Sequence, residues 1–161
     1  MVYRVRPDLL PLYLDLGLTP LKLGEEALVD LRNFSLSGSA RSALRHCVNR
    51  GQREGWELRV LAATEVPAHM DRLRAISDQW LQAKNTREKG ISLGFFDADY
   101  LARTDIAVLA RGEEIVAFAN LWRPQAREEI SIDLMRYAND APPMAMDLLL
   151  VSLMLWSKEQ G

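Results

Sequence analysis

Three β-rich runs follow one another between residues 106 and 137, and they constrain the possible folds of this sequence most strongly. They cover residues 106–111, 115–122 and 129–137, and only Gly112, Glu113 and Glu114 separate the first two. A connection of this length that contains a glycine is typical of a β-hairpin, so we expect adjacent antiparallel strands. Residues 144–159 then form a helical segment that is apolar almost all round and is therefore predicted to be buried. The order predicts an α+β fold in which helices cover a sheet.

The rest of the chain predicts two longer helices and two further strands. One helix is expected over residues 39–53, and another runs from Thr64, the expected N-cap, to Lys84, with Pro67 in its first turn. Strands are expected at 21–31 and 56–61, a short helix or turn at 9–18, a loop at 85–94 and a helical turn at 97–103. Because no repeat, linker or low-complexity tract interrupts the sequence, residues 1–161 are treated as one domain.

Composition excludes several classes of protein. The 161 residues carry a net charge of −2 and are 48% hydrophobic, which is typical of a globular domain and excludes a disordered chain. The most apolar stretch, Leu148 to Trp156, is much shorter than the ~20 residues of a membrane-spanning helix. Cys47 has no second cysteine for a disulfide, so a reducing, cytoplasmic compartment is expected. His46 and His69 have no Cys or His companions at ligand spacing, and we predict no metal site.

Asp133 is the first candidate for chemistry, because it lies in the middle of an otherwise apolar strand. An unpaired buried carboxylate is costly, and Arg136 is a nearby partner. Positions i and i+3 of a regular strand point to opposite faces, so the two side chains reach one cleft only through a β-bulge, a feature common beside active sites. We predict such a bulge; a structural ion pair or a solvated sheet face is the alternative. Regular alternation over this run gives two faces: Ile130, Ile132 and Leu134 on one, and Ser131, Asp133, Met135 and Tyr137 on the other.

The predicted helix over residues 39–53 has a basic face. It carries no acidic residue, and its positive side chains are Arg41, Arg45, Arg50 and Arg53, with His46 beside them. Such a face suits a phosphate-bearing partner such as RNA or a lipid headgroup. The alternative is a solvated helix surface without a partner.

The loop before the last helix limits the choice of cofactor. Three antiparallel strands, a loop and a buried helix follow the order seen in the GNAT acyltransferase core, where the loop binds a pyrophosphate through glycines and backbone N–H groups. Residues 137–144 contain no glycine, two prolines without N–H groups, and Asp140, which would repel phosphate. We therefore expect no acyl-coenzyme A and no other cofactor.

Six strings resemble the cytosolic catalytic region of the phosphatidylglycerol aminoacyltransferases, the lysyl- and alanyl-phosphatidylglycerol synthases also called multiple peptide resistance factors. They are collinear over nearly the whole chain: LYLDLGL (12–18), LGEEA (23–27), FSLSG (34–38), ISLGFFD (91–97), AFAN (117–120) and SIDLMR (131–136). The resemblance implies a GNAT-like mixed sheet with flanking helices. It also implies transfer of a lysyl or alanyl group from aminoacyl-tRNA to phosphatidylglycerol, which alters membrane surface charge and resistance to cationic antimicrobials.

The same resemblance implies site residues and a setting. It favours Asp133 and Arg136 as catalytic residues and Tyr100 as a substrate-binding residue of the cleft. Family members carry membrane helices before this region and further elements after it, so we expect a truncated, partial GNAT-like domain that works at the inner face of the membrane. We also expect the isolated chain to leave apolar surface of the 144–159 helix uncovered and to self-associate. Two alternatives are an acyl-CoA-dependent GNAT N-acetyltransferase and a non-catalytic tRNA- or lipid-binding remnant.

Overall fold

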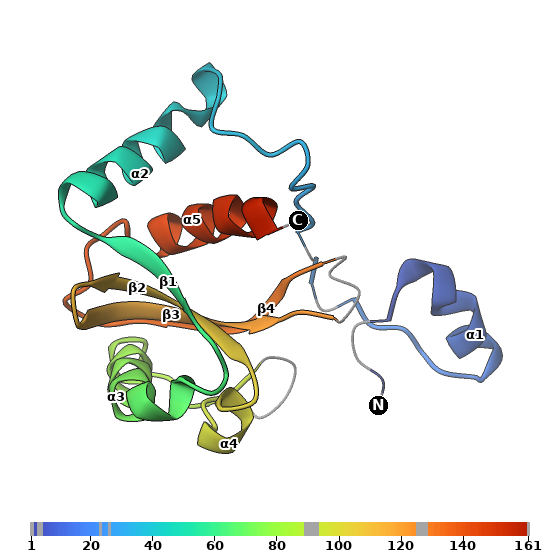
Figure 1. The fold of residues 1–161 in the computed structure, drawn as a ribbon. Helices are drawn as coiled ribbons and strands as arrows, with labels where there is room; N and C mark the ends of the chain where they lie inside the picture. Colours follow the sequence, from blue (N-terminus) through green and yellow to red (C-terminus); the bar gives the residue numbers. More distant parts are fainter. Residues whose placement is uncertain are drawn as a thin grey trace.

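A four-stranded antiparallel sheet lies at the centre of the structure (Figure 1). The computed structural model describes residues 2, 5–22, 24–25, 27–88, 94–124 and 129–160. The strands follow the order β1-β2-β3-β4, with bounds Glu57–Leu61, Asp105–Arg111, Glu114–Trp122 and Ser131–Tyr137. The predicted run of three adjacent antiparallel strands is confirmed, as is the strand at 56–61. Every strand pairing in the described part of the chain is antiparallel, whereas the resemblance implied a mixed sheet.

Helices cover both faces of this sheet (Figure 1). Helices α3 (Val66–Ala83) and α4 (Ala98–Leu101) lie on one face, and α5 (Ala145–Gln160) lies on the other with α2 (Ser42–Arg53) packed on its outer side. Two 3₁₀ turns, Pro7–Leu9 and Ser39–Arg41, precede α1 (Leu10–Asp15) and α2. The predicted helices are confirmed. None of the helices in the described ranges is long and apolar enough to cross a membrane.

The start of α3 differs in detail from the prediction. The residue before the helix is Glu65, and no side chain caps the first turn. The Glu65 carboxylate instead accepts a hydrogen bond of 2.8 Å from the backbone N–H of Ala62. Thr64 is therefore not the N-cap, while Pro67 does lie in the first turn, where its missing N–H costs little.

The α2 helix packs closely on α5. A Cβ added to Gly51 would lie 2.4 Å from a methyl carbon of Leu148, so any larger residue here would force this buried leucine side chain to shift. Cys47 and Val48 are half-buried in the same contact. Burial raises the pKa of the Cys47 thiol above its usual value, which fits a small core residue.

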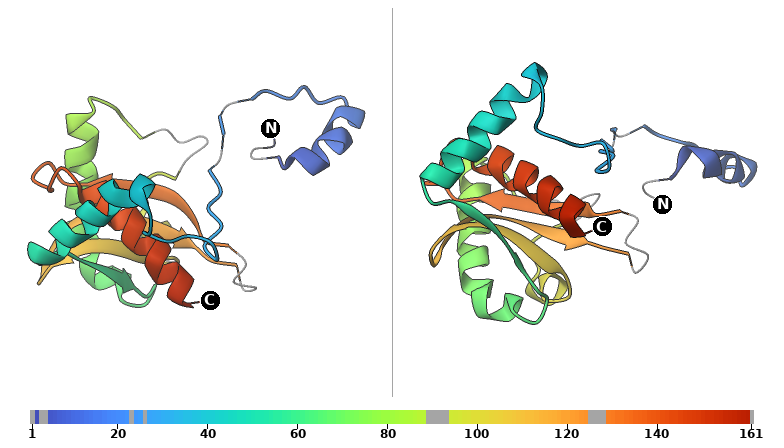
Figure 2. Two further views of the ribbon diagram at one scale, coloured as in Figure 1. Left: turned by 90° about the horizontal axis from the view of Figure 1, so that it is seen from above. Right: turned by 45° about the horizontal axis from the view of Figure 1, so that its top comes forward.

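The segment before α2 differs from the prediction most. No strand forms in the described residues of 21–31, and Leu21 and Leu28 are 78% and 86% exposed. Figure 2 shows this part of the chain running away from the sheet. It is anchored where Lys158 of α5 donates hydrogen bonds to the backbone oxygens of Phe34 (2.8 Å) and Arg32 (3.2 Å).

Helix α5 itself is well covered. Between Ala145 and Ser157 only Asp147 is exposed, because the sheet covers one side of the helix and α2 covers the other. In the described ranges the exposed leucines lie instead in the 3₁₀ turn before α1, in α1 and in the segment after it: Leu9, Leu12, Leu14, Leu16, Leu18, Leu21 and Leu28. The expectation of uncovered apolar surface on the last helix is therefore wrong in its location.

Candidate active site

One extra residue in β4 shapes the candidate site. Ala119 pairs with Met135 and Leu121 pairs with Ile132, so Asp133 and Leu134 together lie opposite Asn120. The backbone N–H groups of both residues donate to Asn120 Oδ1, at 3.2 Å from Asp133 and 2.7 Å from Leu134. This arrangement is a β-bulge. The bulge predicted in the strand is confirmed.

The bulge changes which side chains share a face. Ile132 packs in the cluster against α5, whereas Leu134 packs in the cluster against α3. The alternation predicted for residues 129–137 is therefore wrong beyond Asp133, because it assumed a regular strand. Asp133 contacts Tyr100 of α4, and Arg136 lies over Trp80 of α3. Both side chains thus lie on the α3 side of the sheet, as the predicted bulge requires.

The Asp133 carboxylate is held by two donors. The Tyr100 hydroxyl donates to Oδ2, and the backbone N–H of Gly94 donates to Oδ1 at 2.8 Å. The Tyr100 oxygen in turn accepts hydrogen bonds from Asn120 Nδ2 at 3.0 Å and from Trp122 Nε1 at 2.8 Å. Two strands, α4 and the segment before α4 therefore meet at one carboxylate.

Helix α4 places Tyr100. Its N-cap is Asp97, whose carboxylate accepts a hydrogen bond of 2.8 Å from the Tyr100 backbone N–H, and Leu101 anchors the turn in the core. Burial, and then the hydrogen bond to Asp133, raises the pKa of Tyr100, so the hydroxyl stays protonated at neutral pH. A phenol has one proton and two acceptor positions, and all three are used here. A substrate would have to displace Asp133 to receive the Tyr100 proton.

Arg136 has a different set of neighbours from Asp133. Its guanidinium lies 4.2 Å from the ring centroid of Trp80, and its Nη2 donates to Glu88 at 3.2 Å. The side chain is only 11% exposed, and this burial lowers the pKa of the guanidinium. Within the described ranges no ion pair joins Arg136 to Asp133, so the partner in the structural ion pair is Glu88.

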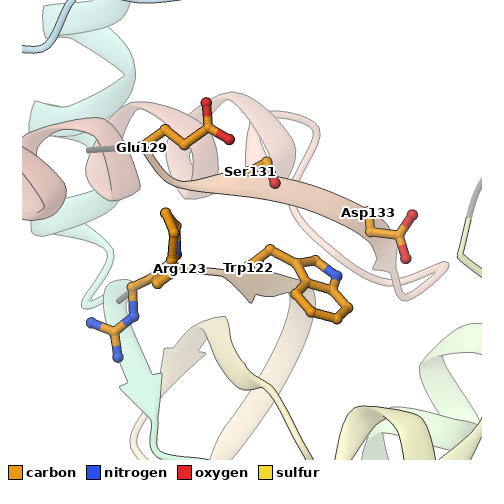
Figure 3. A pocket seen from close by; sticks show the side chains of 6 residues that line it. Trp122, Arg123, Glu129, Ser131 and Asp133 are labelled. Carbon is orange, nitrogen blue, oxygen red and sulfur yellow. The ribbon is translucent and has the colours of Figure 1, made fainter. Parts of the chain in front are cut away.

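An open pocket of about 590 Å³ lies beside Asp133 (Figure 3). Figure 3 shows Glu129, Ser131 and Asp133 following one another along β4 and the residues that lead into it, with Trp122 and Arg123 at the facing end of β3. The six residues that line the pocket are Trp122, Arg123, Pro124, Glu129, Ser131 and Asp133. Arg136 is not among them, so the predicted pair shares a face of the sheet but does not share this pocket.

Two of the predicted basic residues on α2 are engaged within the chain. The Arg45 guanidinium is half-buried and donates to the backbone oxygens of Gly38 (2.6 Å) and Leu36. Arg50 pairs with Glu54 one turn later at 2.7 Å. The predicted exposed face is therefore wrong for Arg45, whose charge holds the chain that enters the helix.

The other two basic residues remain on the outer side of α2. Arg41 is exposed, with its guanidinium 5.8 Å from the ring centroid of Phe34. Arg53 is exposed and, with His46, lines a shallow hollow along the helix. These residues supply positive charge at both ends of α2.

The loop before α5 uses its own amides. The N–H groups of Ala141 and Ala145 donate to the backbone oxygens of Ala138 (3.1 Å) and Pro142 (2.8 Å). These two donors are therefore paired within the loop itself.

Comparison with known proteins identifies the family. The family described as "Phosphatidylglycerol lysyltransferase, C-terminal" matches residues 1–161. The chain belongs to this family. It is 44% identical, over its whole length, to the phosphatidylglycerol lysyltransferase of Bacillus subtilis (strain 168), and 34% identical over 99% of its length to that of Staphylococcus aureus (strain COL). It spans only 19% of each of these relatives.

Solved structures agree with this membership. The C-terminal domain of a putative lysylphosphatidylglycerol synthetase from Agrobacterium fabrum superimposes with a TM-score of 0.89 at 45% identity, over 99% of this chain and 50% of that one. L-PGS from Bacillus licheniformis gives a TM-score of 0.88 at 48% identity, over 99% and 49%. The fold of this chain is therefore that of part of the lysylphosphatidylglycerol synthetase C-terminal region.

Sequence reasoning did not single out several residues of the site. Asn120 could have been found from the sequence. A lone amide in a buried apolar strand needs hydrogen-bond partners, just as the carboxylate of Asp133 does. Gly94 and Trp122 carried no such signal, since their contacts with Asp133 and Tyr100 depend on residues far apart in the chain. Arg123 follows a strand end, and only the fold shows that it lines the pocket.

Proposed function

We propose that this chain carries the chemistry of aminoacyl transfer, moving a lysyl or alanyl group from aminoacyl-tRNA to phosphatidylglycerol. The observation that carries the proposal is the Asp133 carboxylate, which is fixed by Tyr100 and Gly94 and open to the pocket beside Trp122. The names of the relatives favour lysyl as the group transferred. The reaction takes place at the cytoplasmic surface of the membrane, where tRNA and lipid headgroup meet.

The proposed reaction exchanges one ester for another. The Asp133 carboxylate accepts the proton of a glycerol hydroxyl of the lipid, and the hydroxyl oxygen bonds to the carbonyl carbon of the aminoacyl ester. The bond from that carbon to the ribose oxygen of the tRNA then breaks, and the proton passes to the released ribose oxygen. Tyr100 and Gly94 keep the carboxylate aimed at the hydroxyl, which lowers the entropic part of the barrier.

The two arginines near the site take different parts in this proposal. Arg123 lines the pocket, and its guanidinium already pairs with Asp105; in this proposal the lipid phosphate is a second partner for that guanidinium. Arg136 is buried against α3 and supports the site by fixing the end of β4 there. The tRNA backbone binds along α2, where Arg41 and Arg53 are exposed.

A transfer assay with a matched carboxylate control tests the proposal. The purified chain is incubated with labelled lysyl-tRNA or alanyl-tRNA and phosphatidylglycerol vesicles, and labelled lipid is counted. Asp133→Asn should lower the rate by about 10²–10⁴-fold, the usual contribution of a general base. Asp140→Asn, which changes an exposed carboxylate outside the pocket, should leave the rate unchanged.

Two results would contradict the proposal. An Asp133→Asn variant with full activity would remove Asp133 from the chemistry. A folded wild-type chain that binds tRNA or vesicles but transfers neither amino acid would support the alternative of a non-catalytic binding module.

A further inference from the structure

Asn120 is buried in the centre of β3. Residues 115–121 of this strand are all buried, and Asn120 is the single polar side chain among them, with 0% of its surface exposed. A buried amide without hydrogen bonds is costly, so its partners must account for its presence. All of those partners belong to the site around Asp133.

The acceptor end of the Asn120 amide holds the bulge. A bulge leaves backbone groups of the longer strand without ladder partners. Here the N–H groups of Asp133 and Leu134 both donate to Asn120 Oδ1, at 3.2 and 2.7 Å. The side chain of one strand therefore supplies the acceptor that the bulged residues of the other strand require.

The donor end of the same amide orients Tyr100. Asn120 Nδ2 donates to the Tyr100 oxygen at 3.0 Å, and Trp122 Nε1 donates to it at 2.8 Å. With both acceptor positions of the hydroxyl filled, its proton is left to point at Asp133 Oδ2. One amide thus acts on the backbone of Asp133 and, through Tyr100, on its carboxylate.

We infer that Asn120 is a positioning residue for Asp133, holding the bulge that presents this carboxylate and directing the Tyr100 hydroxyl toward it. The inference rests on the proposed function in so far as Asp133 serves the transfer. Asn120 itself does not line the pocket, so it acts through its neighbours.

Two substitutions distinguish the role of the amide oxygen of Asn120 from the role of its N–H group. Asn120→Asp keeps an oxygen acceptor for the bulge but removes the N–H that Tyr100 receives, whereas Asn120→Ala removes both. Ser77→Ala is the matched control, because Ser77 is also 0% exposed but lies on α3 and contributes no hydrogen bond to the site. Each variant is prepared in the whole chain, alone and combined with Tyr100→Phe.

The first readout is backbone amide hydrogen exchange at Asp133 and Leu134, measured by NMR. Losing one buried hydrogen bond should speed exchange of these amides about tenfold in Asn120→Ala relative to Ser77→Ala, whereas Asn120→Asp, whose buried carboxylate lowers the stability of the chain as a whole, should speed their exchange no more than that of other amides of β3. Unchanged exchange in Asn120→Ala would overturn the role in the bulge. Should Asn120→Ala fail to fold, faster exchange of these amides in a folded Asn120→Ser variant would support that role and an unchanged rate would overturn it.

The second readout is the rate of aminoacyl transfer in a double-mutant cycle. Asn120→Asp should lower kcat in the wild-type background and cause little further loss in Tyr100→Phe, because both changes act through one hydroxyl. Losses that multiply would overturn the role through Tyr100. A wild-type chain that transfers nothing would refute the proposed function, and amide exchange would still decide whether Asn120 holds the bulge.

Discussion

Replacing Gly94 with alanine tests whether Asp133 is held as tightly as the structure indicates. A Cβ at this position would lie 2.3 Å from Asp133 Oδ2 and 2.8 Å from its Cγ, whereas ordinary contact begins at 3.4 Å. The backbone of Gly94 does not have a positive φ, so alanine brings steric overlap without backbone strain. The carboxylate must therefore retreat by roughly 1 Å, a displacement that can cost about 10²-fold in rate.

The expected loss of stability follows from the bonds that hold the carboxylate. Retreat breaks the hydrogen bond from the Gly94 N–H or the one from Tyr100, and a hydrogen bond to a charged group contributes about 1.5–3 kcal/mol. Alanine offsets about 0.4–1 kcal/mol of this by reducing the entropy of the unfolded chain. We therefore expect the free energy of unfolding to fall by about 1–2 kcal/mol.

Gly24→Ala is the matched control. A Cβ at Gly24 would have no neighbour within 4 Å, so this variant should be as stable as the wild type or slightly more stable. Urea denaturation followed by tryptophan fluorescence gives the free energies, and the transfer assay gives the rates. A Gly94→Ala protein as stable and as active as Gly24→Ala would refute the reasoning.

Three further predictions follow from the charges and the exposed apolar side chains. Replacing Arg41 and Arg53 with glutamine should flatten a plot of log tRNA affinity against log salt by roughly two units, and an unchanged slope would remove α2 from the proposed tRNA surface. Because the pKa of Tyr100 is raised, the folded chain keeps a proton that the unfolded chain loses near pH 10. The free energy of unfolding should therefore fall as pH rises above about 10, and it should fall less steeply in Tyr100→Phe. Equal slopes of unfolding free energy against pH in the two proteins would contradict this. Leu16→Ser with Leu28→Ser should reduce binding of a hydrophobic dye, since these side chains are 74% and 86% exposed, and undiminished dye binding would place the apolar surface elsewhere.

Local periodicity predicted most helices and strands because it reports which face of an element is apolar. The prediction of a strand at 21–31 was wrong because this periodicity reports only the faces of an element. Alternation of Ala27, Val29 and Leu31 describes two faces but does not supply a neighbouring strand, and none pairs with this segment in the described ranges. The exposure predicted for Arg45 was wrong for a similar reason. A helical projection cannot show that the backbone oxygens of Leu36 and Gly38 lie beside the guanidinium and accept hydrogen bonds from it.

The candidate site was predictable only where a physical cost pointed to it. A carboxylate in an apolar strand, with Arg136 three residues later, was enough to predict a bulge. The groups that hold the carboxylate lie 33 and 39 positions away, in Tyr100 and Gly94, and only tertiary structure brings them together. The separate burial of Arg136 against Trp80 depends on the same long-range packing.

The bulge in β4 has a consequence for insertions and deletions. Directly opposed residues of an antiparallel pair point to the same face of the sheet, so losing one of the two bulged residues would restore regular pairing with β3 and leave every later residue opposite its present partner. Arg136 and Tyr137 would still lie opposite Phe118 and Ala117, but only one side chain would remain opposite Asn120, so the strand would lose either the carboxylate of Asp133 or the core contact of Leu134. A gap of one residue is usually harmless in a surface loop. Natural variation in this strand is therefore expected to exchange its residues more readily than to change their number.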